Sequence, residues 1–400
     1  MGTLTIRSFT PHSSLTSMKD VIDNLSRIIR DAAAQRRPLC IRGGGTKDFY
    51  GGEIRGDPLD TRALRGIVSY EPTELVITAR AGTPLADIEQ ALQEKGQLLP
   101  FEPPHFEDAG QPAAPSPPVV ESNLELAPIP QSSPAGKRAT LGGCVATGLS
   151  GPRRAYAGAV RDFVLGVRVM DARGAELHFG GEVMKNVAGY DVSRLTVGAL
   201  GTLGVILEVS LKVLPVPTAE STVRLAVGPE QAINLMNDWA GKPLPLTATA
   251  YRAGSLSVRL SGAPSAVDAA VKKIGGEAID PVQAVPFWSD IREQRASFFA
   301  GDQPLWRLSV KPTMPPLDLD GPQLIEWGGA LRWLRTDADA RIIREAAARA
   351  GGHATLFRST RKFGSPFHPL SPGLARIHRR LKEAFDPAGI FNPGRLYADL

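Results

Sequence analysis

Cysteine is nearly absent from this 400-residue sequence, which contains only Cys40 and Cys144. Two thiols cannot supply a disulfide framework, a zinc site or the four thiolates that an iron-sulfur cluster usually needs. The sequence also has no run of about 18 apolar residues that could cross a membrane, and residues 1–15 lack the pattern of a secretion signal. We therefore expect a cytoplasmic protein that holds no metal of its own.

An excess of charge of one sign is also missing. The 46 basic and 41 acidic residues give a formal net charge of +5, and the basic residues are scattered along the chain. Nucleic-acid binding normally requires a basic patch, so the sequence predicts no nucleic-acid partner. Hydrophobic residues make up 42% of the sequence. At this length, that share predicts a globular protein of two or three domains.

Hydrophobic periodicity divides the chain at Pro215-Val216-Pro217. Before these prolines, a helical pattern follows Ser17, and strand patterns occur at 39–42, 59–61, 67–70, 75–79, 163–171, 175–179 and 205–214. After them, strand patterns alternate with helical ones such as Pro264–Ile274 and Asp337–Ala350. The second part is therefore predicted to be an α+β domain.

The segment 109–139 differs from the rest of the chain. It contains seven prolines together with alanine and serine, and it has no aromatic residue. Such a composition buries too little apolar surface to offset the entropy lost on ordering. The segment is predicted to be a flexible insert, and a partner-binding segment is the alternative.

Glycine clusters are the most informative feature of the first half. Gly43-Gly44-Gly45 follows a predicted strand, and side-chain-free residues let consecutive backbone N–H groups surround an anion. On this motif alone, a phosphate-binding loop and a tight turn remain equal alternatives, because the chain has neither a Gly-x-Gly-x-x-Gly motif nor a Walker A loop. Two further clusters occur at 142–151 and 198–204. Glycine is costly in an ordinary helix, so close contact with a ligand would explain the cluster at 142–151.

These segments resemble those of a known flavoprotein family. Residues 42–46, 140–151 and 201–206 are similar to the flavin-contacting loops of the vanillyl-alcohol oxidase type, or PCMH-type, FAD-binding domain. Residues 99–104, 150–154, 181–191 and 385–394 more narrowly resemble FAD-binding subunits of bacterial glycolate oxidases. The proline-rich insert is expected to lie outside the family pattern.

The resemblance implies an α+β fold of two domains. Residues 1–217 would form the PCMH-type FAD-binding domain, with the insert at 109–139. Residues 218–375 would form a ferredoxin-like α+β cap, and residues 376–400 a tail that returns to the first domain.

The resemblance also implies a set of residues that bind FAD. The glycine run and Thr46 would hold the pyrophosphate, and Asn392 would approach the edge of the isoalloxazine ring, although an ordinary turn at Asn392 is an equal alternative. The full set is Arg42, Gly43, Gly44, Gly45, Thr46, Lys47, Leu141, Gly142, Gly143, Thr147, Gly148, Gly151, Lys185, Val205, Ile206 and Asn392. Lys185, Arg153 and Arg154 are the cations expected near the flavin N1 side, where a positive charge stabilises the reduced form; surface charges are the alternative.

Relatives that attach FAD covalently carry a histidine soon after the first glycine run, whereas this chain has Lys47-Asp48-Phe49-Tyr50. The resemblance therefore implies noncovalent FAD. Cys144 is expected to be a buried apolar thiol rather than a second attachment point. His353 is a candidate catalytic base, but an ordinary histidine on a strand is the preferred interpretation.

Related 2-hydroxy-acid dehydrogenases carry a His-x-Gly-Asp-Gly-Asn-x-His cluster that this sequence lacks. The leading hypothesis is therefore an FAD-binding subunit of a complex that oxidises glycolate to glyoxylate. A related catalytic flavin subunit and an iron-sulfur subunit would be its partners, and any membrane association would be peripheral and through them. The alternatives are a self-sufficient FAD-dependent 2-hydroxy-acid dehydrogenase and a structural flavin subunit without turnover.

Overall fold

The structure is a computed structural model that describes residues 17–107, 138–181, 191–360 and 364–400. Lys185 and nearly all of the proline-rich segment lie outside the described residues. In the described ranges, no helix is long and apolar enough to cross a membrane.

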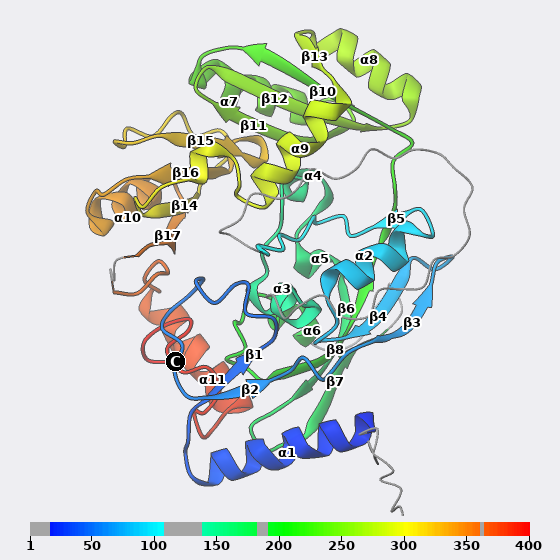
Figure 1. The fold of residues 1–400 in the computed structure, drawn as a ribbon. Helices are drawn as coiled ribbons and strands as arrows, with labels where there is room; N and C mark the ends of the chain where they lie inside the picture. The colour runs from blue at the N-terminus through cyan, green and yellow to red at the C-terminus, as the bar shows by residue number, and fades with distance from the viewer. Residues whose placement is uncertain (1–16, 108–137, 182–190, 361–363) are drawn as a thin grey trace, which may run out of the picture.

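A five-stranded antiparallel sheet forms the centre of the first region (Figure 1). Its strands, in spatial order, are β3 (Ile67–Glu71), β4 (Val76–Arg80), β8 (Val205–Lys212), β6 (Val164–Met170) and β7 (Glu176–Gly180). β8 lies in the middle and is buried along most of its length. The predicted hairpin of β6 and β7 is present, and Asp171 closes its turn by accepting the backbone N–H groups of Arg173 and Ala175.

Helices cover both faces of this sheet. On one face, α2 (Leu85–Gln93), α3 (Leu141–Thr147) and α5 (Val160–Phe163) pack on the sheet in one hydrophobic cluster. On the other face lie α1 (Met18–Ala34) and the parallel pair β1 (Leu39–Arg42) and β2 (Asp57–Asp60). Ser17 caps α1 in a capping box with Asp20, as its position before the helical pattern suggested. The short helix α6 (Val192–Leu195) precedes the Gly198–Gly204 segment.

The chain leaves the first region through β9 (Leu214–Pro215), which pairs with β5 (Gln97–Leu98), and enters a separate eight-stranded sheet at Ala219. The first half of that sheet is β10 (Ala219–Ala226), α7 (Pro229–Ala240), β11 (Leu246–Arg252), β12 (Ser255–Gly262), α8 (Pro264–Ile274) and β13 (Glu277–Ile279). The spatial order β13-β10-β12-β11 is that of a ferredoxin-like βαββαβ unit.

The second half of the sheet repeats this order. After α9 (Pro281–Arg292) come β14 (Leu305–Ser309), β15 (Gln323–Glu326), β16 (Leu331–Arg335), α10 (Ala340–Arg349) and β17 (His353–Arg358), arranged as β15-β16-β14-β17. A loop replaces the helix between β14 and β15, and its side chains Met314, Leu317 and Leu319 pack on the cluster that α10 covers. The two halves join where β11 pairs with β15.

The C-terminal segment returns to the first region through α11 (Pro372–Phe385) (Figure 1). The ammonium group of Lys382 donates to Asp386 (2.7 Å), Phe391 O (2.7 Å) and Thr202 O (2.9 Å). Leu39 N donates to Ile390 O (2.7 Å), which extends the β1 edge. The tail therefore forms part of the first region's structure.

Candidate cofactor site

A cleft in the first region is formed by four segments that are far apart in the sequence. They are the loop after β1, helix α3, the segment around Leu200, and the C-terminal tail. Of the predicted site residues, Arg42, Gly43, Gly44, Gly45, Thr46, Lys47, Gly142, Gly143, Thr147, Ile206 and Asn392 line this cleft. The structure thus brings most of the predicted set to one place.

The loop after β1 leaves its backbone donors unused. The N–H groups of residues 43–47 donate to no acceptor in the described part of the chain. Gly45 has φ +74°, a left-handed conformation that glycine adopts without strain. A row of free N–H groups around a cleft is an anion-binding nest, so this loop is suited to a diphosphate.

Lys47 adds a buried positive charge to the same cleft. Its side chain donates to Thr46 Oγ1 (3.2 Å) and His105 O (3.3 Å), and the residue is only 7% exposed. Among the described residues, no carboxylate oxygen lies within 4 Å of its ammonium nitrogen, and burial lowers the pKa of Lys47. By contrast, Arg42 is paired with Asp48. An anion in the cleft would compensate the charge of Lys47.

The glycines of the loop are required by protein packing as well. A Cβ atom on Gly44 would overlap the carbonyl oxygen of Arg138, and one on Gly43 would overlap Thr140 Oγ1. A Cβ on Gly142 would lie 2.8 Å from Ala81 Cβ. These glycines therefore let the loop and α3 approach their neighbours, whereas the sequence suggested that their role was to admit the ligand.

Helix α3 supplies a wall of the cleft but no free donors at its start. Leu141 N donates to Thr83 O (2.9 Å), Gly142 N to Ala81 O (2.7 Å) and Gly143 N to the capping Thr140 Oγ1 (3.3 Å). Thr147 Oγ1 donates back to Gly143 O (2.8 Å). The loop after β1, rather than this helix, thus offers the donors for an anion.

Asn392 lies at the floor of the cleft and connects three segments. Its Oδ1 accepts from Ile41 N (2.7 Å), its Nδ2 donates to Leu200 O (2.6 Å), and its own N donates to Leu39 O (2.9 Å). Its φ of +42° is unusual for a residue other than glycine. Asn392 therefore holds the cleft together through its side chain.

The remaining predicted residues lie elsewhere. Leu141 and Val205 are buried in the hydrophobic clusters on opposite faces of the sheet. Gly148 caps the C-terminus of α3 with φ +62°, and Gly151 lies at a second cavity between the two regions. Lys185 is outside the described residues.

Sequence reasoning missed several residues of the cleft. Three of them, Thr140, Leu200 and Arg395, lie next to motif residues in the sequence. That proximity to the motifs was the only sequence signal that could have placed them at the cleft. Arg395 donates to Asp48 O (3.3 Å) and to Gly52 O and holds the tail against the loop after β1. Cys40 and Ala146 are small apolar wall residues, for which the sequence gives no signal.

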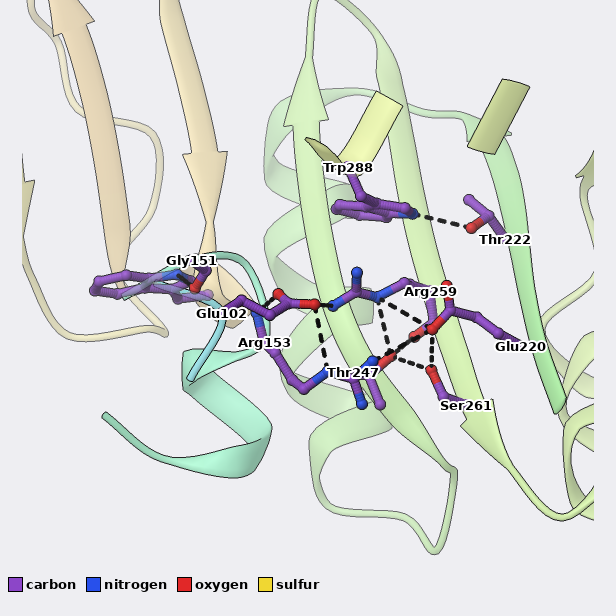
Figure 2. A network of polar contacts seen from close by, with 10 residues as sticks. Glu102, Gly151, Arg153, Glu220, Thr222, Thr247, Arg259, Ser261 and Trp288 are labelled. Carbon is purple, nitrogen blue, oxygen red and sulfur yellow. Dashed lines mark hydrogen bonds and ion pairs between the residues drawn. The ribbon is translucent and has the colours of Figure 1, made fainter. Parts of the chain in front are cut away.

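Arg153 belongs to a polar network between the two regions rather than to the cleft (Figure 2). Glu102 accepts from Arg259 Nη2 (2.8 Å) and from the backbone N of Arg153 (2.9 Å). The Arg153 side chain also reaches Glu220 (3.3 Å), whose carboxylate accepts from Ser261 Oγ (2.7 Å). Arg259 is almost fully buried, so this network connects the first region firmly to β10 and β12.

His353 begins β17, on a strand of the second region as the alternation of its neighbours indicated. It is exposed and lines neither the cleft nor the second cavity. Desolvation of the part of its ring that lies against the protein, followed by the charge of Arg307, lowers the pKa of His353. Arg154 contacts the Trp327 ring, with 4.3 Å between Cζ and the ring centroid.

Comparison with known proteins identifies the cofactor of this chain. The FAD binding domain family matches residues 20–116 and 121–180, and the family of FAD linked oxidases, C-terminal domain, matches residues 369–396. The first match covers most of the proline-rich segment, apart from residues 117–120, so our expectation that this segment lies outside the family pattern was wrong for most of its length.

Relatives of known function and structure agree with these matches. Glycolate oxidase subunit GlcE of Escherichia coli is 46% identical over 372 residues, which cover 93% of this chain and 96% of that protein. Glycolate oxidase subunit GlcD of Bacillus subtilis is 29% identical over 204 residues, covering 50% of this chain and 37% of that protein. A solved structure of alkyldihydroxyacetonephosphate synthase is 16% identical and superposes with a TM-score of 0.61 over 95% of this chain and 76% of that one.

The fold and the cleft define an FAD-dependent oxidoreductase of the vanillyl-alcohol oxidase type, with a PCMH-type FAD-binding domain and FAD as cofactor. Within that class, the chain belongs to the family of glycolate oxidase subunit GlcE. The resemblance noted from the motifs is thereby confirmed.

Proposed function

We propose that this chain is the FAD-binding subunit of a glycolate oxidase complex that oxidises glycolate to glyoxylate and passes the electrons on through an iron-sulfur partner. The identity of 46% to a glycolate oxidase subunit supports the substrate. The structural observation that carries the proposal is the combination, in one cleft, of the buried charge of Lys47 with five backbone N–H groups that have no acceptor among the described residues. A diphosphate would satisfy both features.

Each part of the cleft would have a separate role. Residues 43–47 would donate to the diphosphate through the backbone, and Lys47 would neutralise part of its charge. Gly143, Thr147 and Ile206 would form the walls, and Asn392 would keep the tail in place against β1. Bound FAD supplies the acceptor for a hydride, and the protein holds and orients it.

Among the described residues that line the cleft, the one carboxylate is Asp48, and it is paired with Arg42 rather than free to act as a base. Removing a hydride from a hydroxyl-bearing carbon requires a group within hydrogen-bonding reach that takes the hydroxyl proton. In the described ranges, no histidine lines the cleft, and no group of three His, Cys, Asp or Glu side chains could hold a metal. Both cysteines are buried and free. We therefore propose that a related catalytic flavin subunit oxidises glycolate and that an iron-sulfur subunit takes up the electrons.

FAD would be held without a covalent bond. Cys144 is fully buried, and burial raises its pKa to about 12, so the thiol is not ionised and is a poor nucleophile. Acid precipitation of the purified protein should leave the yellow colour in the supernatant. Colour that stays in the washed pellet would contradict noncovalent binding.

The role of Lys47 can be tested apart from folding. Lys47→Met removes a buried charge without a carboxylate partner, so the flavin-free protein should melt at the same or a higher temperature. The same change should weaken FAD binding by about tenfold or more, because a charge-assisted contact is lost. The matched control is Lys95→Met, at an exposed lysine, which should change neither the melting temperature nor the FAD affinity. Unchanged FAD affinity in Lys47→Met would argue against the assignment of the cleft.

The division of labour requires a separate assay. The purified chain loaded with FAD, glycolate and an artificial dye acceptor should show no turnover, and turnover should appear when the partner subunits are added. We propose a cytoplasmic location, with any membrane contact made through those partners. Robust turnover by the single chain would instead make it a self-sufficient dehydrogenase.

A further inference from the structure

The loop 102–107 contacts both the flavin cleft and the second region. Two of its residues, Glu102 and Phe106, have φ values of +46° and +53°. Left-handed backbone is uncommon for residues other than glycine, and it persists where the surrounding structure enforces it. The contacts that hold this loop therefore deserve a functional explanation, and one set of them comes from the second region.

Glu293 reaches the loop from the second region. It is the C-cap residue of α9, and its side chain is only 6% exposed. Its Oε2 accepts from His105 N and Phe106 N, each at 2.9 Å, while its Oε1 accepts from Arg292 Nε (2.7 Å). One carboxylate of the second region thus fixes two consecutive peptide groups of a first-region loop.

The ring of His105 fixes the same loop from within the first region. Its Nε2 lies 3.0 Å from Glu89 Oε2, and its Nδ1 lies 3.7 Å from Glu107 Oε1. Burial acts to lower the pKa of His105, but Glu107 and Glu89 outweigh burial and raise it to about 9, so the ring is charged at neutral pH. His105 is therefore held through its backbone by one region and through its ring by the other.

The carbonyl oxygen of His105 is a partner of Lys47 at the cleft. Among the described residues, the ammonium group of Lys47 donates to this oxygen (3.3 Å) and to Thr46 Oγ1 (3.2 Å). Thr46 precedes Lys47 directly, so His105 is the partner that fixes the ammonium group from a distant segment. Burial lowers the pKa of Lys47, and the charge of Glu293 is one of those that oppose this effect.

We propose that Glu293 is a positioning residue for the flavin cleft: it fixes His105, whose carbonyl oxygen keeps the ammonium group of Lys47 directed at the diphosphate. Glu293 itself does not line the cleft. The inference rests on the proposed function of the cleft and adds to it a dependence on the second region. Because coupled binding is reciprocal, FAD in the cleft should also hold the second region more firmly against the loop.

A double-mutant cycle on the flavin-free full chain tests the inference, with FAD affinity measured by fluorescence titration. Glu293→Ala should weaken FAD binding by about fivefold, and by no more than Lys47→Met does, because Glu293 acts through Lys47. In the Lys47→Met background, Glu293→Ala should have no further effect on FAD affinity. An equal loss from Glu293→Ala in both backgrounds would contradict the inference, because Glu293 would then act independently of Lys47.

Two conservative variants separate the position of the carboxylate from its charge. Glu293→Gln loses the charge but keeps an oxygen at the same reach, so its FAD affinity should stay within about twofold of the original. Glu293→Asp keeps the charge but is one methylene shorter and cannot reach both N–H groups, so it should weaken binding as Glu293→Ala does. A loss in Glu293→Gln as large as that in Glu293→Asp would overturn the inference. This pair decides the matter even if Glu293→Ala does not fold.

Asp290→Ala is the matched control. Asp290 lies on the same helix and pairs with Arg295 at 3.0 Å, but it makes no hydrogen bond to the loop 102–107. It should leave FAD affinity unchanged, and a loss equal to that of Glu293→Ala would show that any disturbance of α9 reaches the cleft. If Lys47→Met itself binds FAD normally, the proposed function fails as well. A loss in Lys47→Met with none in Glu293→Ala would reject this inference alone.

Discussion

At the scale of single residues, Gly44 shows that one position can serve both packing and ligand binding. Its missing side chain leaves room for the carbonyl oxygen of Arg138, and its N–H group is free in the cleft. Gly44→Ala should therefore destabilise even the flavin-free protein, by about 2 kcal/mol or more, because the loop must move. Urea unfolding of the apoprotein measures this loss of free energy of unfolding. Gly228→Ala, at φ −73° with open space around it, is the control and should be nearly neutral.

Glu326 should make stability depend on pH. Burial raises the pKa of Glu326 from its ordinary 4.5 to about 8, and between these values the unfolded carboxyl group has lost its proton while the folded one keeps it. The free energy of unfolding should therefore fall as pH rises through this window, by up to about 1.4 kcal/mol per pH unit from this group. In the Glu326→Gln variant, the free energy of unfolding, measured by urea titrations at pH 5 to 8, should fall less steeply with pH by that amount. A slope no different from that of the exposed control Glu383→Gln would show that Glu326 is ionised in the folded protein.

The sequence identified the residues around the glycine run but not their environments. Lys47 was expected to bind FAD, but nothing in Thr46-Lys47-Asp48 indicated that its side chain is buried, because lysine is rarely buried. Arg153 was expected near the flavin, yet its partners Glu102 and Glu220 are distant in the sequence and come together only in the folded chain. Pairings of that kind depend on tertiary structure, which a motif does not contain.

At the scale of elements, α11 allows a comparison between a buried and an exposed ion pair. Lys382 and Asp386 are 2.7 Å apart and nearly fully buried, whereas Arg379 and Asp399 are more than half exposed. Lys382→Met leaves the buried Asp386 carboxylate without its cation, although Ile390 N and Phe391 N still donate to it, and should cost about 3 kcal/mol. Arg379→Met should cost less than about 1 kcal/mol.

The same comparison tests the role of the tail. Because α11 leads directly to Asn392, Lys382→Met should also lower the FAD content measured by flavin absorbance, and Arg379→Met should leave it unchanged. Equal losses of stability in the two variants would mean that α11 does not anchor the tail through Lys382.

Individual elements were the most predictable level of structure. The helix Pro264–Ile274 and the hairpin around Asp171 lie where periodicity placed them, because each buries one face of a regular pattern. The strand expected at 205–214 is divided into β8 and β9, since Leu214–Pro215 turns away to pair with β5. Such a departure depends on a partner strand more than 100 residues away, so local periodicity does not indicate it.

At the scale of the whole molecule, the fold class implied by the motifs is confirmed, but the repeated order within the cap was not visible in the sequence. The loop that replaces the second unit's first helix removes the helical pattern that would have revealed the repeat. The second cavity was missed for a similar reason, because its lining comes from both regions and surrounds a charge, Arg307, that sits in an ordinary strand pattern.

The two halves of the cap should open separately. Each half has its own helix-covered hydrophobic cluster, and the strands of the two halves pair at two positions, Ala250 with Glu326 and Tyr251 with Ile325, beside a third cluster that both halves share. Native-state hydrogen exchange should therefore group the amides of 219–279 and 305–358 into two units with different opening free energies. A single opening free energy across all eight strands would show that the cap behaves as one unit.

The place where β11 meets β15 also has a consequence for how this protein can change over evolutionary time. Glu326 forms one of the two residue pairs that join the halves, and Trp327 follows it directly. Because each half completes its own ferredoxin-like order, the joint lies between two complete units. A change at the joint is therefore expected to alter how the two halves are held together before it alters the strand order within either half.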